Sequence, residues 1–139
     1  MYKRQPELKG HGCQRLAAEV YGGVLLAPWF DRDLSLAGRV TYKTKAGDIC
    51  STLIDFKKPI AQVPSLAIHL DRKANDERKI QRQKDLNLVL ALGDEKLDFV
   101  SLLADQLDET EVEVLDHEIF AYDTQAPTCL LYTSDAADD

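Results

Sequence analysis

The feature that most constrains this sequence is a pair of neighbouring segments rich in residues favoured in β-strands. Residues 36–44 and 49–56 carry Val, Ile, Thr, Tyr and Phe at high density, and such side chains suit a pleated, half-buried surface. Between them, Ala46-Gly47-Asp48 supplies turn residues, since glycine reaches backbone conformations that other residues avoid. The two segments therefore predict an antiparallel hairpin.

Three later segments predict further regular structure. Leucine recurs at every second position over residues 86–92, which favours a strand, although leucine is the better helix former. Apolar residues fall at helical spacing over residues 99–107, with Asp94 as a candidate N-cap. Residues 112–122 predict a last strand. We expect a β-rich α+β fold with one helix around residues 95–107.

Several of the remaining segments carry loop or turn signals. Gly10-His11-Gly12 and Tyr21-Gly22-Gly23 are turn signals, and Pro59 and Pro64 bracket a short irregular link. Residues 71–85 are densely charged and have no apolar period, so they predict a solvated loop.

Composition and charge exclude several classes of protein. A chain of 139 residues, 45% of them hydrophobic, suits a single domain with a modest core. The longest apolar stretch, Val24 to Phe30, contains Pro28 and is too short to cross a bilayer. The net charge of −7 disfavours nucleic acid and anionic membranes as partners, because phosphates attract basic surfaces. Three cysteines without motif spacing favour a cytoplasmic setting, with Cys13 and Cys50 as packing residues.

The two ends of the chain look different from the rest. Residues 1–5, Met-Tyr-Lys-Arg-Gln, and residues 129–139, which begin Cys-Leu-Leu-Tyr-Thr-Ser, match the two orientations of a transposase adapter used in DNA sequencing, translated in frame. The alternative for the second is an ordinary Asp-rich tail. We therefore expect natural sequence over residues 6–128 only, with motifs that are missing here lying outside it.

The histidines do not form a metal-binding motif. His11, His69 and His117 are isolated, and none has a ligand partner at zinc-like spacing such as the i, i+4 pair of a helix. Asp116-His117-Glu118 has the composition of a metal cluster, but neighbouring side chains of a strand point to opposite faces and cannot converge on one ion. We assign no metal ligand and no cofactor-binding residue.

Two other positions allow both a structural and a functional interpretation. His69 stands in an otherwise apolar stretch from Leu66 to Leu70, where it is either a core histidine bonded to backbone or an imidazole at an interface that serves in catalysis. Asp31-Arg32-Asp33 is either a catalytic carboxylate pair or, as is more usual, an ion-pair network that fixes a turn. From the residues alone, the function stays undetermined.

Several stretches together resemble the aspartyl aminopeptidases, in the order in which that family has them. They are Glu19-Val20-Tyr21-Gly22-Gly23; the distinctive block from Pro28-Trp29-Phe30-Asp31-Arg32-Asp33 to Gly38-Arg39-Val40; Ile60, Pro64 and Leu66-Ala67-Ile68-His69-Leu70-Asp71-Arg72, followed by Asn75 and Glu77; and Phe120-Ala121-Tyr122-Asp123-Thr124-Gln125. These blocks cover nearly all of residues 6–128. Residues 71–85 depart from the family in spacing, and no role is carried over from within them.

The resemblance implies a place within a larger enzyme. Family members insert a β-rich dimerisation domain into an α/β zinc-peptidase domain, and their dimers build a dodecamer. Two zinc ions activate water and a glutamate acts as general base, so that an N-terminal residue, preferably Asp or Glu, is removed from a peptide. Residues 6–128 would be the dimerisation insert with its junctions. The metal ligands would lie outside the chain, which alone would bind no zinc and be inactive.

The resemblance also implies a role for one residue. The family's insert extends a histidine of an Ile-His-Leu motif into the neighbouring subunit's active site, and His69 is the matching position. His69 would then be catalytic in trans, supplying a hydrogen bond or charge where the tetrahedral intermediate forms. The alternative to an enzyme fragment is a non-catalytic β-rich oligomerisation or interaction module.

Overall fold

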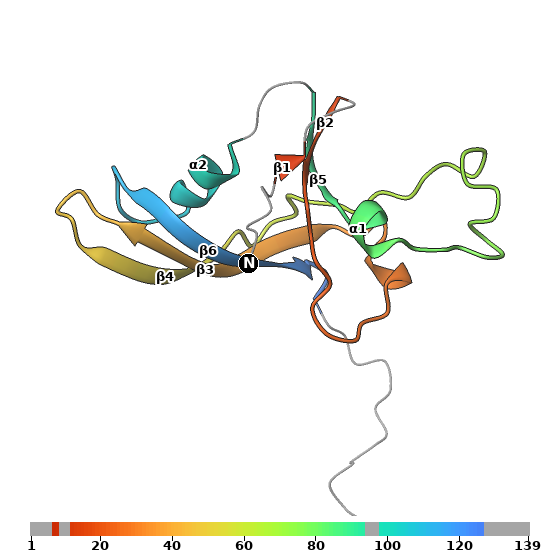
Figure 1. Cartoon of the computed structure of the whole chain (residues 1–139), viewed down its shortest axis with the longest axis horizontal. Helices are drawn as coiled ribbons and strands as arrows, with labels where there is room; N and C mark the ends of the chain where they lie inside the picture. Colours follow the sequence, from red (N-terminus) through yellow and green to blue (C-terminus); the bar gives the residue numbers. More distant parts are fainter. Residues whose placement is uncertain (1–6, 9–11, 94–97, 127–139) are drawn as a thin grey trace, which may run out of the picture.

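Two small antiparallel sheets form the framework of the molecule (Figure 1). The computed structural model describes residues 7–8, 12–93 and 98–126. Within them, one three-stranded sheet has the order β4 (Ile49–Asp55), β3 (Leu34–Lys43), β6 (Glu113–Asp123). The other has the order β1 (Glu7–Leu8), β2 (Cys13–Leu16), β5 (Leu88–Leu92). The expected β-rich α+β fold is confirmed.

The larger sheet contains the predicted hairpin and the predicted last strand. β3 pairs with β4 from Ala37↔Asp55 to Lys43↔Ile49. The turn closes through hydrogen bonds from the Thr44 amide to the Asp48 carbonyl and from the Gly47 amide to the Thr44 carbonyl, both 2.9 Å. Gly47 has a φ of 96°, a conformation that glycine adopts without steric cost. The other edge of β3 pairs with β6 along its whole length.

The smaller sheet was predicted only in part. The alternating leucines do form β5, whereas no strand was predicted for its partner β2, which follows the Gly10-His11-Gly12 turn signal. β2 has only four residues, and a register shift between Gln14 and Arg15 interrupts its pairing. So short and irregular a strand has no period-two signal to detect.

The predicted helix is present but short. α2 comprises Phe99–Ala104, and the Asp98 carboxylate accepts hydrogen bonds from the amides of Val100 and Ser101. Asp98 is thus the N-cap, whereas the expected cap, Asp94, lies outside the described residues. Two shorter helices, η1 (Ala27–Trp29) and α1 (Arg82–Asp85), complete the described secondary structure.

A single apolar core lies between the two sheets and α2. Alternate side chains of β3 point into it, with Leu34, Leu36 and Val40 almost fully buried. Leu88 of β5 and Leu103 of α2 close it from the other side. No described helix is long and apolar enough to span a membrane.

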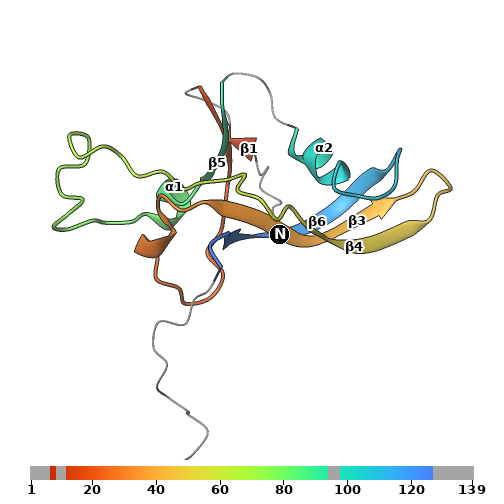
Figure 2. The same ribbon diagram turned by 180° about the vertical axis from the view of Figure 1, so that it is seen from behind.

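One segment projects from this body. Residues 65–80, hereafter the arm, run outward as an irregular loop in yellow-green to green and return just before α1 (Figures 1 and 2). Turns at residues 68–70 and 72–76 are the local structure of the arm. The predicted solvated loop of residues 71–85 is therefore present except for the single turn of α1, and it starts earlier than expected.

Candidate functional site

His69 lies in the turn of residues 68–70 in the arm, and its side chain is exposed to solvent. It sits in a turn in which the amides of Leu70 and Asp71 donate hydrogen bonds to the Ala67 carbonyl, at 2.8 and 3.2 Å. The interpretation of His69 as a core histidine is therefore wrong. The apolar stretch around it lies outside the core of the described residues, because it belongs to the projecting arm.

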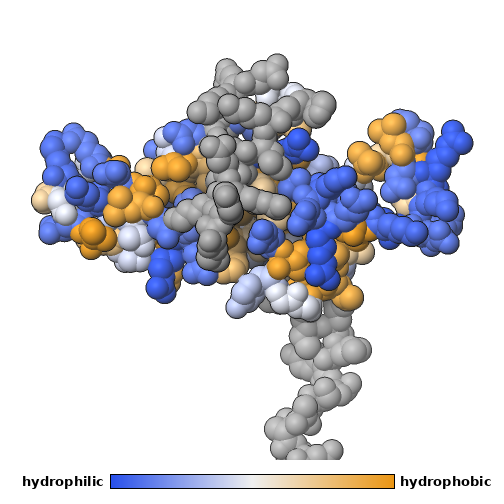
Figure 3. Space-filling view, in the orientation of Figure 1, coloured by the Kyte–Doolittle hydropathy of each residue, from blue (hydrophilic) through white to orange (hydrophobic). Residues whose placement is uncertain are grey.

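The residues beside His69 are exposed as well. Leu66, Ile68 and Leu70 have exposed fractions of 64%, 53% and 68%. In Figure 3 hydrophobic residues lie among hydrophilic ones where the arm projects. Clustered apolar side chains that face solvent are typical of a surface that a partner covers. The arm thus presents an imidazole that is flanked in the sequence by exposed apolar side chains.

The base of the arm is attached to the body at one corner. The Ser65 amide donates a hydrogen bond to Asp31 Oδ1 at 2.7 Å, and Arg78 Nη1 donates to Ser65 Oγ at 3.2 Å. The Arg78 guanidinium carbon lies 3.6 Å from the centroid of the Phe30 ring. Hydrogen bonds from the Ser65 hydroxyl and amide, together with the Arg78 charge, outweigh desolvation and lower the pKa of Asp31. Sequence reasoning missed Ser65 and Arg78, because no local pattern links them to Phe30.

Asp31-Arg32-Asp33 forms a structural network rather than a catalytic pair. Asp31 accepts from Ser65, whereas Arg32 donates to the Pro28 carbonyl at 2.7 Å and to Asp123 Oδ2 at 2.5 Å. Asp33 accepts hydrogen bonds from Thr124 through its backbone carbonyl. The triplet therefore ties the start of β3 to the end of β6 and to the arm, and the Asp31 carboxylate and the Arg32 guanidinium engage different partners.

Of the other two histidines, only His117 belongs to the residues that the structure describes. His117 is half-buried on β6, where its ring packs edge-on against Phe99 with centroids 5.6 Å apart. Its neighbours Asp116 and Glu118 are exposed. His11 lies outside the described residues. Among the residues that the structure describes, no three His, Cys, Asp or Glu side chains come together in a way that could hold a metal ion.

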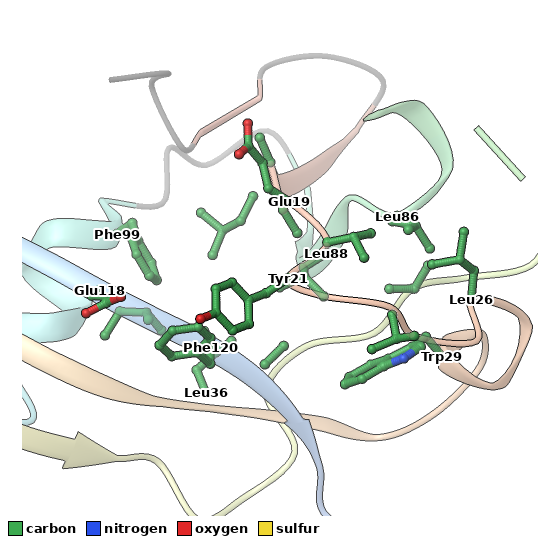
Figure 4. A pocket seen from close by; sticks show the side chains of 18 of the residues that line it. Glu19, Tyr21, Leu26, Trp29, Leu36, Leu86, Leu88, Phe99, Glu118 and Phe120 are labelled. Atoms are coloured by element: carbon green, nitrogen blue, oxygen red, sulfur yellow. The ribbon is translucent and has the colours of Figure 1, made fainter. Parts of the chain in front are cut away.

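A cavity of about 650 Å³ opens between β6 and the segment that follows β2 (Figure 4). Tyr21 and Phe120 meet edge to face at one side with centroids 6.1 Å apart, and Leu26 and Trp29 lie at the other. Its lining is mostly apolar, with Glu19 and Glu118 as the carboxylates and Tyr21 and His117 as the other titratable residues. A concave, mostly apolar lining with a few polar groups is typical of a binding pocket.

Comparison with known proteins identifies the family. The model of the aminopeptidase I zinc metalloprotease family (M18) matches residues 1–131. The chain belongs to this family. Two curated relatives, each named probable M18 family aminopeptidase 2, come from Azotobacter vinelandii and Pseudomonas putida. Both are 57% identical to the chain in alignments 130 and 129 residues long, which cover 89% and 88% of the chain and 30% of each relative.

Solved structures of M18 enzymes share the fold. The cryo-EM structure of the Ape4 and Nbr1 complex matches with a TM-score of 0.78 and 26% identity, over 88% of this chain and 27% of that one. The crystal structure of prApe1 matches with a TM-score of 0.72 and 26% identity, over 88% and 30%. The predicted membership of a zinc aminopeptidase family is confirmed, and the chain spans about 30% of the length of the M18 relatives it matches.

Proposed function

We propose that this chain is the assembly insert of a zinc-dependent aminopeptidase that removes N-terminal Asp or Glu from peptides, and that His69 completes the active site of a neighbouring subunit. The observation that carries the proposal is the exposed His69 on a projecting arm, flanked by the exposed side chains of Leu66, Ile68 and Leu70.

The energetics favour an arm that is covered in the assembly. Burying one Leu or Ile side chain fully contributes about 1.5–3 kcal/mol, so three such side chains anchor an interface substantially. Because His69 lies between these residues in the sequence, burying them against a partner also brings the imidazole to the surface of that partner. The structure of the S. cerevisiae mApe1 dodecamer shares the fold of this chain, and the proposal gives this chain a place in an oligomer as well.

The described residues do not fit a zinc ion, since no group of three potential ligands comes together among them. The proposal therefore places the zinc ligands in the part of the parent protein outside this chain, and it routes no step through a metal on these residues. His69 is the chain's own contribution, a hydrogen-bond donor or positive charge near the reacting carbonyl. The chain alone is proposed to be inactive and to bind no zinc.

Two finer points rest on sequence. The preference for acidic N-terminal residues follows from the resemblance of the blocks around Trp29 and His69 to the aspartyl aminopeptidases. A cytoplasmic location follows from cysteines that lack the pattern of a disulfide scaffold. Residues 1–5 and 129–139, predicted to be translated adapter, lie outside the described residues, and this stays a prediction.

The first test is to recover and translate the DNA that flanks this segment. We expect a His-Thr-Asp motif shortly upstream and a Glu-Glu pair downstream, which would supply the zinc ligands and the general base. A stop codon or unrelated sequence on either side would contradict the enzyme and leave a non-catalytic interaction module.

A further inference from the structure

Both ends of the arm converge on one corner of the body. Its first residue, Ser65, bonds to Asp31 through its amide, and Arg78, near its other end, bonds to the Ser65 hydroxyl. The Arg78 guanidinium also lies over the Phe30 ring. We call these four residues, Phe30, Asp31, Ser65 and Arg78, the arm latch.

The corner that receives the arm is itself firmly held. Phe30 is buried in the core and pairs with Val63 in a β-bridge. The Asp31 amide donates to the Val63 carbonyl at 2.9 Å, and Asp31 has a φ of 59°. A non-glycine residue persists in this left-handed conformation only where its surroundings impose it. Because Phe30 and Asp31 are fixed, the contacts of the latch also fix the position of the first residue of the arm.

Beyond the latch, the backbone hydrogen bonds of the arm join residues of the arm to one another. Those of residues 66–77 join Ala67, Asp71 and Lys73 to amides a few residues further on, and Lys73 pairs with Glu77. In the described part of the chain, none of these bonds reaches the body. The direction in which the arm leaves the body thus depends on its base.

We propose that Arg78 is a positioning residue: by bridging Ser65 and the Phe30 ring, it closes the base of the arm and sets where His69 stands. This inference rests on the proposed function of His69. A planar guanidinium suits the bridge, because it stacks on a ring and donates in its own plane at once, which an ammonium group cannot do.

The first test measures the latch itself by hydrogen exchange in the complete parent protein. Arg78→Gln should speed amide exchange in residues 66–77 on the order of tenfold, since the arm loses its closure. The matched control is Lys79→Gln, which removes an equal charge from the next, exposed position and should leave exchange unchanged. Equal exchange in wild type and Arg78→Gln would overturn the latch.

The second test measures positioning by a double-mutant cycle. Arg78→Gln should lower kcat about tenfold with a smaller change in KM, because a displaced group loses effective contact in the transition state. Lys79→Gln should match the wild type. The variant carrying both His69→Ala and Arg78→Gln should be no slower than His69→Ala alone, since Arg78 acts through His69. Arg78→Lys should have a kcat close to that of Arg78→Gln, because the ammonium group cannot form both contacts. This variant keeps the charge, so it replaces Arg78→Gln in the test if that variant assembles poorly.

The outcomes separate the two proposals. Losses that multiply in the double variant, or an unchanged kcat in Arg78→Gln despite faster exchange, would overturn the positioning role while leaving His69 in place. An unchanged kcat in His69→Ala would overturn the proposed function of His69 and the positioning role with it, whereas the exchange result would still decide whether the latch holds the arm.

Discussion

Gly38 lies in the middle of β3, opposite Ile119 of β6, and its missing side chain lets the two strands pair. A Cβ at this position would stand 2.0 Å from the Glu118 carbonyl oxygen, which is backbone and cannot swing away. The sequence shows a glycine inside a predicted strand. The need for glycine at this position becomes clear only from the register of β3 with β6, which comes much later in the chain.

Replacing Gly38 with Ala should therefore destabilise the larger sheet. We expect a loss of about 3 kcal/mol, seen as a lower melting temperature of the complete protein. Gly23→Ala is the control, because no atom lies within 4 Å of the Cβ that it would add. Equal melting temperatures for the two variants would contradict the close approach of β3 and β6.

Elements differ in how much their own residues predict. The hairpin of β3 and β4 and the strand β6 follow from dense β-branched and aromatic side chains, and a glycine turn sets the hairpin. β2 could not be predicted, because four residues with a shifted register acquire their strand form only by pairing with β5. The helix was predicted from its apolar spacing, yet its start is decided by the Asp98 cap.

The larger sheet is also tied across its width by a titratable contact. The Tyr122 hydroxyl on β6 donates to Asp55 Oδ1 at the end of β4, at 2.6 Å. This bond is the main reason why the pKa of Asp55 lies below its ordinary value, and the hydrogen bond from the Lys57 amide lowers it further. A lowered pKa in the folded state means that the stabilisation is present above the unfolded pKa and is lost as the pH falls through the folded one.

Tyr122→Phe should therefore reduce the acid sensitivity that Asp55 confers. The pKa of Asp55, followed by NMR, should rise toward its ordinary value, and the stability difference between neutral pH and about pH 3 should shrink. Tyr21→Phe, which removes a hydroxyl from an exposed ring, should change neither. An unshifted Asp55 in Tyr122→Phe would show that the hydroxyl does not hold the carboxylate.

The molecule as a whole places its candidate catalytic residue outside its own core. The arm carries His69 and three exposed apolar side chains into solvent, and the chain spans about 30% of the M18 relatives it matches. A group displayed in this way has no reacting partner within the described residues. The proposed function therefore makes a prediction about pairs of subunits.

Mixed oligomers should complement each other. His69→Ala subunits should turn over slowly while keeping their oligomeric state, and subunits whose zinc ligands are removed should be inactive. Co-assembled, they should regain activity, because an intact zinc site then receives His69 from its neighbour. The recovered activity is measured as hydrolysis of a peptide with an N-terminal aspartyl residue. The control is a mixture of the two variants that were assembled separately and cannot exchange subunits. Co-assembly without recovery would place His69 outside the shared site.

The sequence by itself determined the β-rich class, the hairpin, the last strand and the M18 resemblance, because these depend on local composition and on the order of blocks along the chain. It also marked His69 and Asp31-Arg32-Asp33 without choosing between their interpretations. Tertiary structure decided that His69 is exposed, that Asp31-Arg32-Asp33 forms a structural network, and that Arg78 contacts Phe30 and Ser65. Contacts of this kind join residues far apart in the chain, so no local pattern records them; they exist only once the sheets have brought the segments together.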